Sequence, residues 1–339
     1  MATKGDQTIL VTGANSFIAG HIVAQALAKG YKVSGTVRSE EAANKVRKAF
    51  DKYQSQLRIS IVADIKKPEL YESAFASASA PVTAVIHTAS PFTFAIKDNE
   101  TDLLKPAIEG STAILKAVKQ YGGSVRHVVS TSSFAGVADL TQGLRPGYTY
   151  TDKDWAPFTY EFAKDADIVP AYGASKALAE KAMWEFVEKE QVAFTLTTIN
   201  PPWVFGPHQG GPPPLANLNV STGMLWRLVD SPEVPPPDFL SCADVRDVAA
   251  AHIAAIEKAD AAGKRFLIGS KFTYQDAVDI ARETIVSLRD RLPKGTPGAG
   301  KELETYTLDK TQVEGLLGRA LTPVATTITD TLTQLLEAK

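Results

Sequence analysis

Residues 8–20, which read TILVTGANSFIAG, decide the fold of this chain. The first five are apolar or β-branched and predict a short buried strand. A glycine turn follows at 13–20, then a helical pattern with apolar residues at 18, 22 and 26, and a second strand at 31–37. A strand, a glycine turn, a helix and a strand within this span indicate the opening unit of a doubly wound dinucleotide-binding fold.

The same alternation of strands and helices continues through the next 160 residues or so. Further strands are predicted at 57–62, 82–87, 125–130 and 194–199. Helices are predicted at 40–53 and 98–121, and a third helix follows a loop that covers 131–171. Repeated strand–helix units with apolar strands are typical of a parallel sheet covered by helices on both faces. We therefore expect an α/β fold with a doubly wound parallel sheet.

The character of the chain changes after residue 200. Six prolines fall within residues 201–214, which we interpret as loop. Helical patterns follow at 215–229, 244–257, 274–288 and 324–336, and a strand at 265–268 is expected to rejoin the sheet. We expect a cofactor-binding Rossmann domain of residues 1–155, 171–202 and 241–269, and a smaller, discontinuous substrate domain of residues 156–170, 203–240 and 270–339.

Composition narrows the class of protein. Of 339 residues, 44% are hydrophobic and 22% charged, and the formal net charge is -2, as in soluble globular proteins. There is no basic cluster that predicts a nucleic-acid or membrane surface, no apolar run of about 20 residues and no signal-peptide pattern. The one cysteine, Cys242, predicts a reducing compartment, and we expect a buried thiol in a cytoplasmic protein without a bound metal.

The glycine turn is a candidate phosphate site. Its spacing is Gly13-x-x-Ser16-x-x-Ala19, with a serine where the dinucleotide fingerprint usually has its middle glycine. Backbone N–H groups at the start of a helix favour negative charge, so this turn is expected to face the pyrophosphate of a cofactor. The residues of the turn that we expect to bind the cofactor are Gly13, Asn15, Ser16, Phe17 and Ile18.

The ends of later strands supply the other cofactor candidates. No carboxylate stands among residues 36–39, whereas Arg38 can pair with a 2′-phosphate, so NADP is predicted over NAD. Asp64 and Ile65 are placed to contact adenine, although Asp64 is equally suited to capping the next helix. Thr88, Ala89 and Ser90 follow the fourth strand, at the sheet edge where ligands bind in this architecture.

Tyr172 and Lys176 are the candidate acid–base pair. They stand four residues apart in an Ala-rich segment, YGASKALAE, which puts both side chains on one face of a helix. A nearby lysine cation is expected to lower the tyrosine pKa and to suit it for proton transfer to a carbonyl oxygen. The polar run Thr131-Ser132-Ser133 follows the fifth strand, where a serine hydroxyl can donate to the same oxygen.

Taken together, these motifs resemble the extended short-chain dehydrogenase/reductase superfamily. The resemblance is nearest to the branch with fungal NADPH-dependent aldehyde, ketone and methylglyoxal reductases and plant dihydroflavonol reductase. It covers essentially the whole chain and rests on TGANSFIAGH (12–21), TVRS (36–39), HTASPF (87–92), TSS (131–133), YGASK (172–176) and NPPWVFGP (200–207).

The resemblance implies a role for each matching residue. Tyr172 is the implied proton donor, Lys176 holds the nicotinamide ribose, and Ser133 polarises the substrate oxygen. Pro201 and Val204 are implied to flank the nicotinamide. An apolar, aromatic pocket is expected from Phe92, Phe94, Phe134, Trp203 and Trp226, each of which is as compatible with core packing.

These expectations add up to an NADPH-dependent carbonyl reductase acting on a small or aryl aldehyde or ketone, as a monomer or homodimer. One alternative is a sugar-nucleotide epimerase or dehydratase on the same scaffold, which the missing acidic residue after the second strand disfavours. Another is a regulator that senses NADP(H) without turnover. Such a regulator tends to lose the tyrosine or the lysine, and this chain has both.

Overall fold

The computed structural model describes residues 3–90 and 96–338, and two of the expected pocket residues, Phe92 and Phe94, lie outside this range. The chain forms two compact units. The first consists of Met1–Thr141, Asp152–Asn200 and Ala249–Phe266, and the second of Gln142–Thr151, Pro201–Val248 and Leu267–Lys339. These boundaries differ from those of the expected domains, and the cofactor and substrate roles of the two parts stay predictions.

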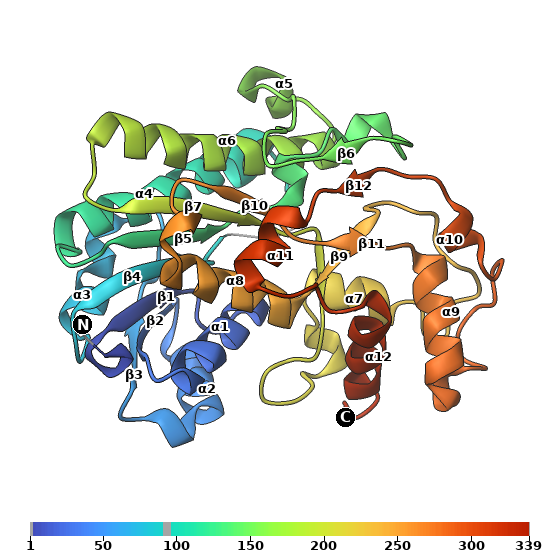
Figure 1. Cartoon of the computed structure of the whole chain (residues 1–339), viewed down its shortest axis with the longest axis horizontal. Helices are drawn as coiled ribbons and strands as arrows, with labels where there is room; N and C mark the ends of the chain where they lie inside the picture. Colours follow the sequence, from blue (N-terminus) through green and yellow to red (C-terminus); the bar gives the residue numbers. More distant parts are fainter. Residues whose placement is uncertain (1–2, 91–95, 339) are drawn as a thin grey trace. The chain divides into compact units, whose positions relative to one another are not determined.

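The first unit is built on a seven-stranded sheet, as expected for a doubly wound fold (Figure 1). Its strand order is β10-β7-β5-β4-β1-β2-β3. The pairs from β3 across to β7 are parallel. The strands span β1 (Thr8–Thr12), β2 (Lys32–Val37), β3 (Leu57–Ile61), β4 (Val82–His87), β5 (His127–Thr131), β7 (Thr195–Asn200) and β10 (Arg265–Leu267).

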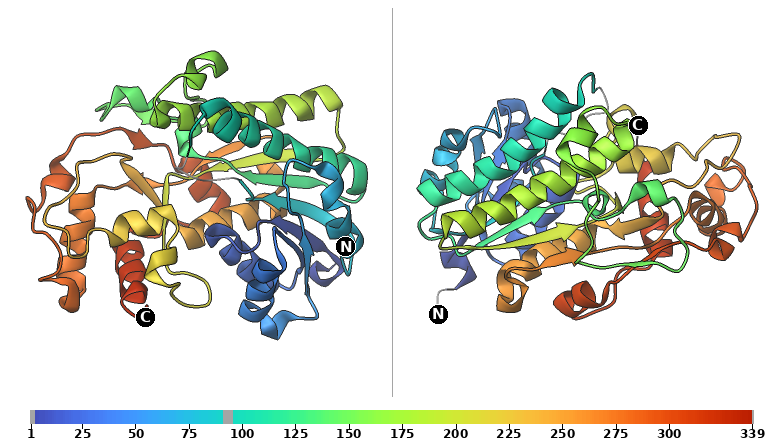
Figure 2. Two further views of the ribbon diagram at one scale, coloured as in Figure 1. Left: turned by 180° about the vertical axis from the view of Figure 1, so that it is seen from behind. Right: turned by 90° about the horizontal axis from the view of Figure 1, so that it is seen from above.

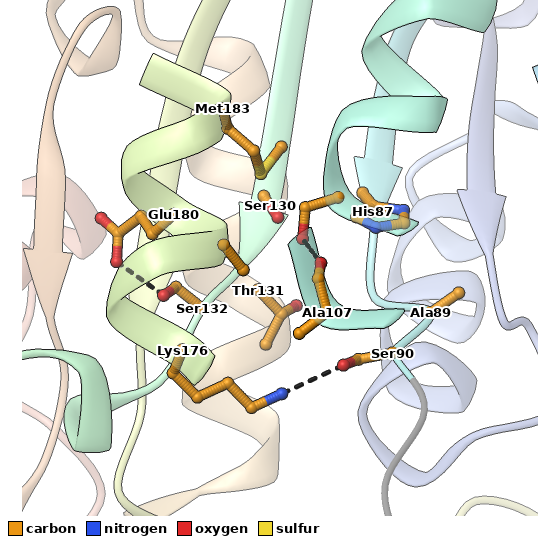
Figure 3. Close-up of a pocket in the computed structure, with 12 residues that line it drawn as sticks. His87, Ala89, Ser90, Ala107, Ser130, Thr131, Ser132, Lys176, Glu180 and Met183 are labelled. Carbon is orange, nitrogen blue, oxygen red and sulfur yellow. Dashed lines mark hydrogen bonds between the residues drawn. The ribbon is translucent and has the colours of Figure 1, made fainter. Parts of the chain in front are cut away.

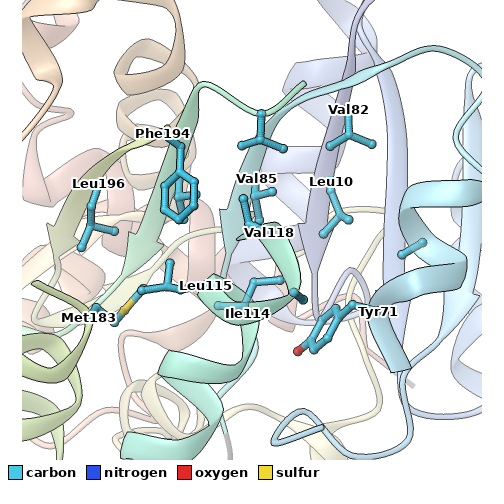
Figure 4. Packing of buried hydrophobic residues seen from close by; sticks show 14 of the residues in the cluster. Leu10, Tyr71, Val82, Val85, Ile114, Leu115, Val118, Met183, Phe194 and Leu196 are labelled. Carbon is cyan, nitrogen blue, oxygen red and sulfur yellow. The ribbon is translucent and has the colours of Figure 1, made fainter. Parts of the chain in front are cut away.

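Helices cover both faces of this sheet (Figures 1 and 2). One face carries α1 (Phe17–Ala28), α2 (Glu40–Ala49) and α8 (Val245–Glu257), and the other carries α3 (Glu72–Ala76), α4 (Lys105–Tyr121) and α6 (Ile168–Glu190). The short α5 (Tyr160–Lys164) precedes α6. Apolar side chains of α4 and α6, such as Leu115 and Met183, pack on Leu10, Val85 and Leu196 of the strands (Figure 4). The alternation read from the sequence is confirmed.

The strand order reverses direction at β1, which has β2 on one side and β4 on the other. The carboxyl ends of β1 and β4 meet there, with Thr12 opposite His87. In open α/β sheets ligands bind outside the strand ends at such a switch point. The glycine turn after Thr12 and the segment after His87 are therefore brought together by the topology.

Helix α6 begins at Ile168 and not at Tyr172, where we expected it to open. Asp167 is its N-cap residue and Pro170 lies in its first turn, where a proline costs no intrahelical hydrogen bond. Tyr172 therefore stands one turn inside the helix. The expected helix over 98–121 likewise begins as a π-helical turn, Glu100–Leu104, before α4.

The second unit contains two small sheets and the remaining helices. β8 (Trp203–Phe205), β9 (Ser241–Asp244) and β11 (Ser270–Lys271) form one sheet, and β6 (Thr149–Tyr150) pairs with β12 (Thr307–Leu308). The helices are α7 (Val220–Trp226), α9 (Tyr274–Thr284), α10 (Ala299–Glu302), α11 (Thr311–Leu317) and α12 (Val324–Leu335). Side chains such as Phe205, Phe272 and Leu332 form their common core.

Two expectations about this unit have a clear outcome. The interpretation of 201–214 as loop is wrong for Trp203–Phe205, because three residues between prolines still find backbone partners along β9. Cys242 lies in β9 and is 2% exposed, so the expected buried thiol is confirmed. Burial raises the pKa of this thiol well above its usual range.

Candidate active site

The site is built where α6 passes very close to the 3-10 turn Phe134–Gly136 that follows β5. A Cβ atom on Gly136 would lie 3.0 Å from the backbone nitrogen of Ala177, and one on Gly173 would lie 3.0 Å from the carbonyl oxygen of Ala135. Glycine at both positions permits this approach, which larger side chains would prevent. The segment after β5 is thereby held against the turn of α6 that carries Tyr172 and Lys176.

Ser133 and Tyr172 meet at this contact. Ser133 is 8% exposed and caps the 3-10 turn, with its Oγ accepting from the Ala135 N–H at 3.1 Å. Burial raises the pKa of Tyr172 to about 12, and a side-chain hydrogen bond with Ser133 opposes that rise. The two expected hydrogen-bond donors to a substrate oxygen are therefore adjacent in the structure.

Lys176 lies one turn further along α6, and its Nζ is 5.4 Å from the centre of the Tyr172 ring. The ammonium donates to Ser90 Oγ at 3.0 Å (Figure 3). Burial lowers the pKa of Lys176 to about 8. The expected lowering of the Tyr172 pKa by Lys176 is wrong for this structure, because burial disfavours the charged form of both groups.

Ser90 is placed by the junction of β1 and β4. Thr12 Oγ1 accepts the N–H groups of Thr88 and Ala89, each at 3.1 Å, and the Thr88 hydroxyl donates to the Thr12 carbonyl at 2.5 Å. These bonds fix Thr88 and Ala89, the two residues that lead to Ser90, along the end of β1. The expected cofactor segment Thr88-Ala89-Ser90 thus lies between the glycine turn and Lys176.

His87, at the end of β4, is buried beneath this segment. Its Nδ1 is 2.9 Å from Thr12 Oγ1, and burial, with a smaller contribution from the Lys176 charge, lowers its pKa to about 4. The folded protein therefore favours neutral His87, whereas the unfolded chain takes up a proton below about pH 6.5. The contribution of His87 to stability is complete above pH 6.5 and is lost as the pH falls toward 4.

We expect this loss to amount to about 3 kcal/mol, since one unit of pKa corresponds to about 1.4 kcal/mol. Urea unfolding of wild type and His87→Asn at pH 7 and pH 4.5 measures it. The asparagine keeps a polar group beside Thr12 but does not titrate, so the wild type is expected to lose more stability than the variant on acidification. Equal losses would contradict a buried neutral His87.

The glycine turn has the shape that a dinucleotide requires. Gly13 has a φ of +65°, and a Cβ atom there would lie 3.2 Å from the Cα of Ala89. Asn15 and Ser16 are exposed beside it. Helix α1 begins directly afterwards with Phe17 and Ile18, and the Ser16 side chain makes no cap hydrogen bond to it. The start of a helix favours negative charge, which fits a bound pyrophosphate at this turn.

The end of β2 fits a 2′-phosphate. Arg38 is exposed, and its guanidinium has no hydrogen-bond or ion-pair partner among the residues that the structure describes. The nearest following carboxylates, Glu40 and Glu41, belong to α2 and pair with Arg47 and Lys45. A cation without a protein partner at this position favours NADP over NAD.

Asp64 and Ile65 follow β3 in a tight turn. Asp64 Oδ1 accepts from the Lys66 N–H at 3.0 Å within this turn, whereas the N-cap residue of the next helix, Pro68–Tyr71, is Lys67, so the expectation that Asp64 caps that helix is wrong. The Cδ1 atom of Ile65 would lie 2.9 Å from a Cβ atom on Gly110 of α4. Ile65 therefore packs against that helix, and the adenine contact of both residues stays a prediction.

The remaining expected site residues divide into two groups. Phe134 is 0% exposed, so its ring packs in the interior and this structure gives no support to its expected contact with substrate. Pro201, Val204, Trp203 and Trp226 belong to the second unit. There, Val204 is buried in β8, and Trp203 Nε1 donates to Asp238 Oδ1 at 3.3 Å. Their roles toward cofactor and substrate stay predictions.

A cluster around Glu180 was not found from the sequence. Glu180 lies one turn after Lys176 on α6, and its buried carboxylate accepts from Ser132, next to Ser133 (Figure 3). Its spacing from Lys176 was a signal that the site extends along α6, but a glutamate at this spacing is usually solvated. Beside it is a small cavity of about 30 Å³, lined by His87, Ala89, Ser90, Ala107, Ser111, Ser130, Thr131, Ser132, Lys176, Ala179, Glu180 and Met183.

Comparison with known proteins gives consistent matches. The sequence profile of the NAD dependent epimerase/dehydratase family matches residues 9–269. The chain is 39% identical over 338 residues to the NADPH-dependent methylglyoxal reductase GRE2 of Saccharomyces cerevisiae, covering 97% of this chain and 98% of that protein.

Solved structures agree with this relationship. The yeast methylglyoxal/isovaleraldehyde reductase Gre2 complexed with NADPH matches with a TM-score of 0.90 and 38% identity, covering 97% of this chain and 98% of that one. Gre2 of Candida albicans in complex with NADPH matches with a TM-score of 0.87 and 33% identity, covering 98% and 99%. Among the described residues, no helix is long and apolar enough to cross a membrane, and no cluster of potential metal ligands is found.

Proposed function

The chain belongs to the NAD dependent epimerase/dehydratase family, whose members are extended short-chain dehydrogenases/reductases. On this basis we propose that it is an NADPH-dependent carbonyl reductase. The observation that carries the proposal is the adjacency of Ser133, Tyr172 and Lys176 at the carboxyl edge of the sheet. According to their names, relatives that are similar in sequence and structure reduce carbonyl compounds or are complexed with NADPH, which supports the same assignment.

Two side chains act on the carbonyl oxygen of the substrate in this proposal. Ser133 and Tyr172 donate hydrogen bonds to the carbonyl oxygen of the substrate and stabilise the negative charge that develops on it. Tyr172 then transfers its proton to that oxygen, which completes the alcohol. A high tyrosine pKa keeps this proton in place at neutral pH until charge appears on the oxygen.

NADPH, when bound, supplies the hydride that reduces the carbonyl carbon. The chain would hold its pyrophosphate at the start of α1 through the turn at Gly13, Asn15, Ser16, Phe17 and Ile18, and its 2′-phosphate with Arg38. Lys176 and Ser90 would contact the nicotinamide ribose, and Thr88 and Ala89 would border the cofactor. Pro201 and Val204 would complete its nicotinamide end.

The test is the loss of NADPH absorbance with methylglyoxal, isovaleraldehyde and a set of aryl ketones. Turnover with at least one of them is expected. If NADPH binds tightly by calorimetry but no carbonyl is reduced, the reductase assignment fails and a cofactor-sensing protein is favoured. Interconversion of a sugar nucleotide without net NADPH consumption would instead favour the epimerase alternative.

Arg38→Ala is expected to raise the KM for NADPH about 10- to 100-fold and to leave the KM for NADH within about 2-fold. The reason is that a hydrogen bond to a charged partner contributes about 1.5–3 kcal/mol, and only NADPH carries the 2′-phosphate. Initial rates with both cofactors measure the ratio. Arg47→Ala, which removes a guanidinium that pairs with Glu40 on α2, is the matched control. An unchanged NADPH preference in Arg38→Ala would contradict the assigned contact.

The finer parts of the proposal concern substrate, assembly and compartment. Aromatic candidates in the second unit, Trp203 and Trp226, favour a small or aryl aldehyde or ketone. We further propose a monomer or homodimer in the cytoplasm, in keeping with a single buried cysteine.

A further inference from the structure

Glu180 is a charged group buried in the interior of the first unit. Its side chain is 1% exposed, and it lies one helical turn beyond Lys176 on α6. An isolated buried carboxylate is costly, so a protein keeps one only with compensating partners. The partners of Glu180 come from four parts of the chain, and they connect it to the segment that carries Ser133.

One carboxylate oxygen holds the ends of β5 and β7. Glu180 Oε2 accepts from the Ser132 hydroxyl at 2.6 Å and from Asn200 Nδ2 at 2.7 Å. Ser132 directly precedes Ser133, and its backbone N–H also bonds to the Ile199 carbonyl of β7 at 2.8 Å. The same Asn200 amide group is 3.5 Å from the Ser133 carbonyl oxygen. Ser132 and Asn200, the two residues that donate to Glu180 Oε2, therefore both lie next to Ser133.

The other oxygen is tied to groups away from that segment. Glu180 Oε1 accepts from Arg265 Nε at 2.7 Å, from Thr198 Oγ1 at 2.8 Å and from Trp184 Nε1 at 3.3 Å. Arg265 is itself held, because it donates to the carbonyl oxygens of Asp152 and Asp154 and its guanidinium lies 3.6 Å from the centre of the Trp155 ring. Arg265 supplies the positive charge that keeps the carboxylate ionised.

From this geometry we propose that Glu180 is a positioning residue for the reduction. It ties the Ser132–Ser133 segment to α6 one turn beyond Lys176, so that Ser133 is held beside Tyr172 and the two hydroxyls converge on one substrate oxygen. The inference rests on the proposed function. Displacement of a reacting group by about 1 Å is enough to cost about 100-fold in rate, so a fixed separation of these two hydroxyls has a direct catalytic value.

The role requires a carboxylate and not merely a polar side chain of that size. All five neighbours of the two oxygens point a donor at them. Arg265 Nε and Trp184 Nε1 can only donate, so a glutamine is expected to keep its carbonyl oxygen toward them and to place its NH₂ group against Ser132 and Asn200. Glu180→Gln is therefore expected to release the Ser132 side while the volume stays the same.

The experiment compares steady-state kinetics and NADPH affinity in three single variants and one double variant. Glu180→Gln is expected to lower kcat about 10- to 100-fold, with the KM for the carbonyl and the Kd for NADPH within about 3-fold of wild type. Ser132→Ala removes only the hydroxyl that links Glu180 to the Ser133 segment and is expected to lower kcat at least 5-fold. The double variant is expected to be no slower than Glu180→Gln, because both changes break the same connection.

Trp184→Phe is the matched control, since it removes a donor to the same carboxylate on the side away from Ser133. Its kcat is expected to stay within about 2-fold of wild type even if its melting temperature falls. The inference would be overturned if Glu180→Gln and Ser132→Ala both keep a kcat within 2-fold of wild type. It would also be overturned if the two losses in kcat multiply in the double variant. If Glu180→Gln does not fold, Ser132→Ala with Trp184→Phe decides the question.

The outcome separates the inference from the proposed function. Wild-type enzyme that reduces carbonyl compounds while its Glu180 and Ser132 variants keep full kcat would leave the reductase in place and remove the positioning role. Wild-type enzyme without any carbonyl reduction would remove both. Reduced NADPH affinity as the main effect of Glu180→Gln would show a cofactor-site defect and would also overturn the positioning role.

Discussion

Tyr172→Phe is expected to lower kcat about 100- to 10,000-fold, which is the range for removal of a positioned general acid. The phenylalanine keeps the ring in its place on α6, beside Gly173 and the turn after β5, and removes only the hydroxyl. The protein then has no proton to transfer to the substrate oxygen at this position. NADPH affinity and the melting temperature are expected to stay close to those of wild type.

Single-turnover absorbance of NADPH with saturating carbonyl substrate measures this effect, and calorimetry measures the cofactor Kd. Tyr160→Phe is a suitable control, because Tyr160 lies on α5 and its hydroxyl donates to Glu100 at 3.0 Å. A kcat for Tyr172→Phe within 10-fold of wild type would show that another group supplies the proton.

Ser133→Ala is expected to give the second largest effect, a fall in kcat of about 100- to 1,000-fold. Removal of one preorganised donor to a developing oxyanion has effects of this size. Loss of the hydroxyl also removes the hydrogen bond that opposes the rise in the Tyr172 pKa. The variant is therefore expected to impair both the stabilisation of the oxygen and the proton transfer to it.

Ser175→Ala is the control for this prediction. Ser175 lies in the same YGASK segment and is buried. Its hydroxyl donates to the Tyr172 carbonyl of the preceding turn at 2.8 Å, so this hydrogen bond lies within the helix. Its kcat is expected to remain within about 2-fold of wild type. Equal effects of the two substitutions would mean that Ser133 acts only on the stability of the segment.

Local patterns were enough to predict the architecture of the first unit. The apolar run at 8–12, the glycine turn and the returning strand at 31–37 correspond to β1, the turn before α1 and β2. The family was also recognisable from motifs spread along the chain, and the comparisons confirm it. These features depend on residues that are near one another in sequence, so periodicity and turn chemistry suffice to find them.

Features that depend on contacts between distant segments were not found. The pKa of Tyr172 was expected to fall because Lys176 is near it, whereas burial raises it. Phe134 was expected to face a ligand, whereas it lies in the 3-10 turn that Ser133 caps and its ring is buried in the interior. Burial depends on how the whole molecule packs, so the spacing of residues along one helix does not predict how burial shifts a pKa.

The sequence by itself determined the alternation of strands and helices in the first unit, and it predicted the cofactor turn and the Ser133, Tyr172 and Lys176 set. Only the tertiary structure decided what holds that set in place. Glu180 joins residues 132, 180, 200 and 265, which are separated by as many as 133 positions in the chain. Its significance follows from five donors converging on one buried carboxylate, and that convergence exists only after the sheet and α6 have packed together.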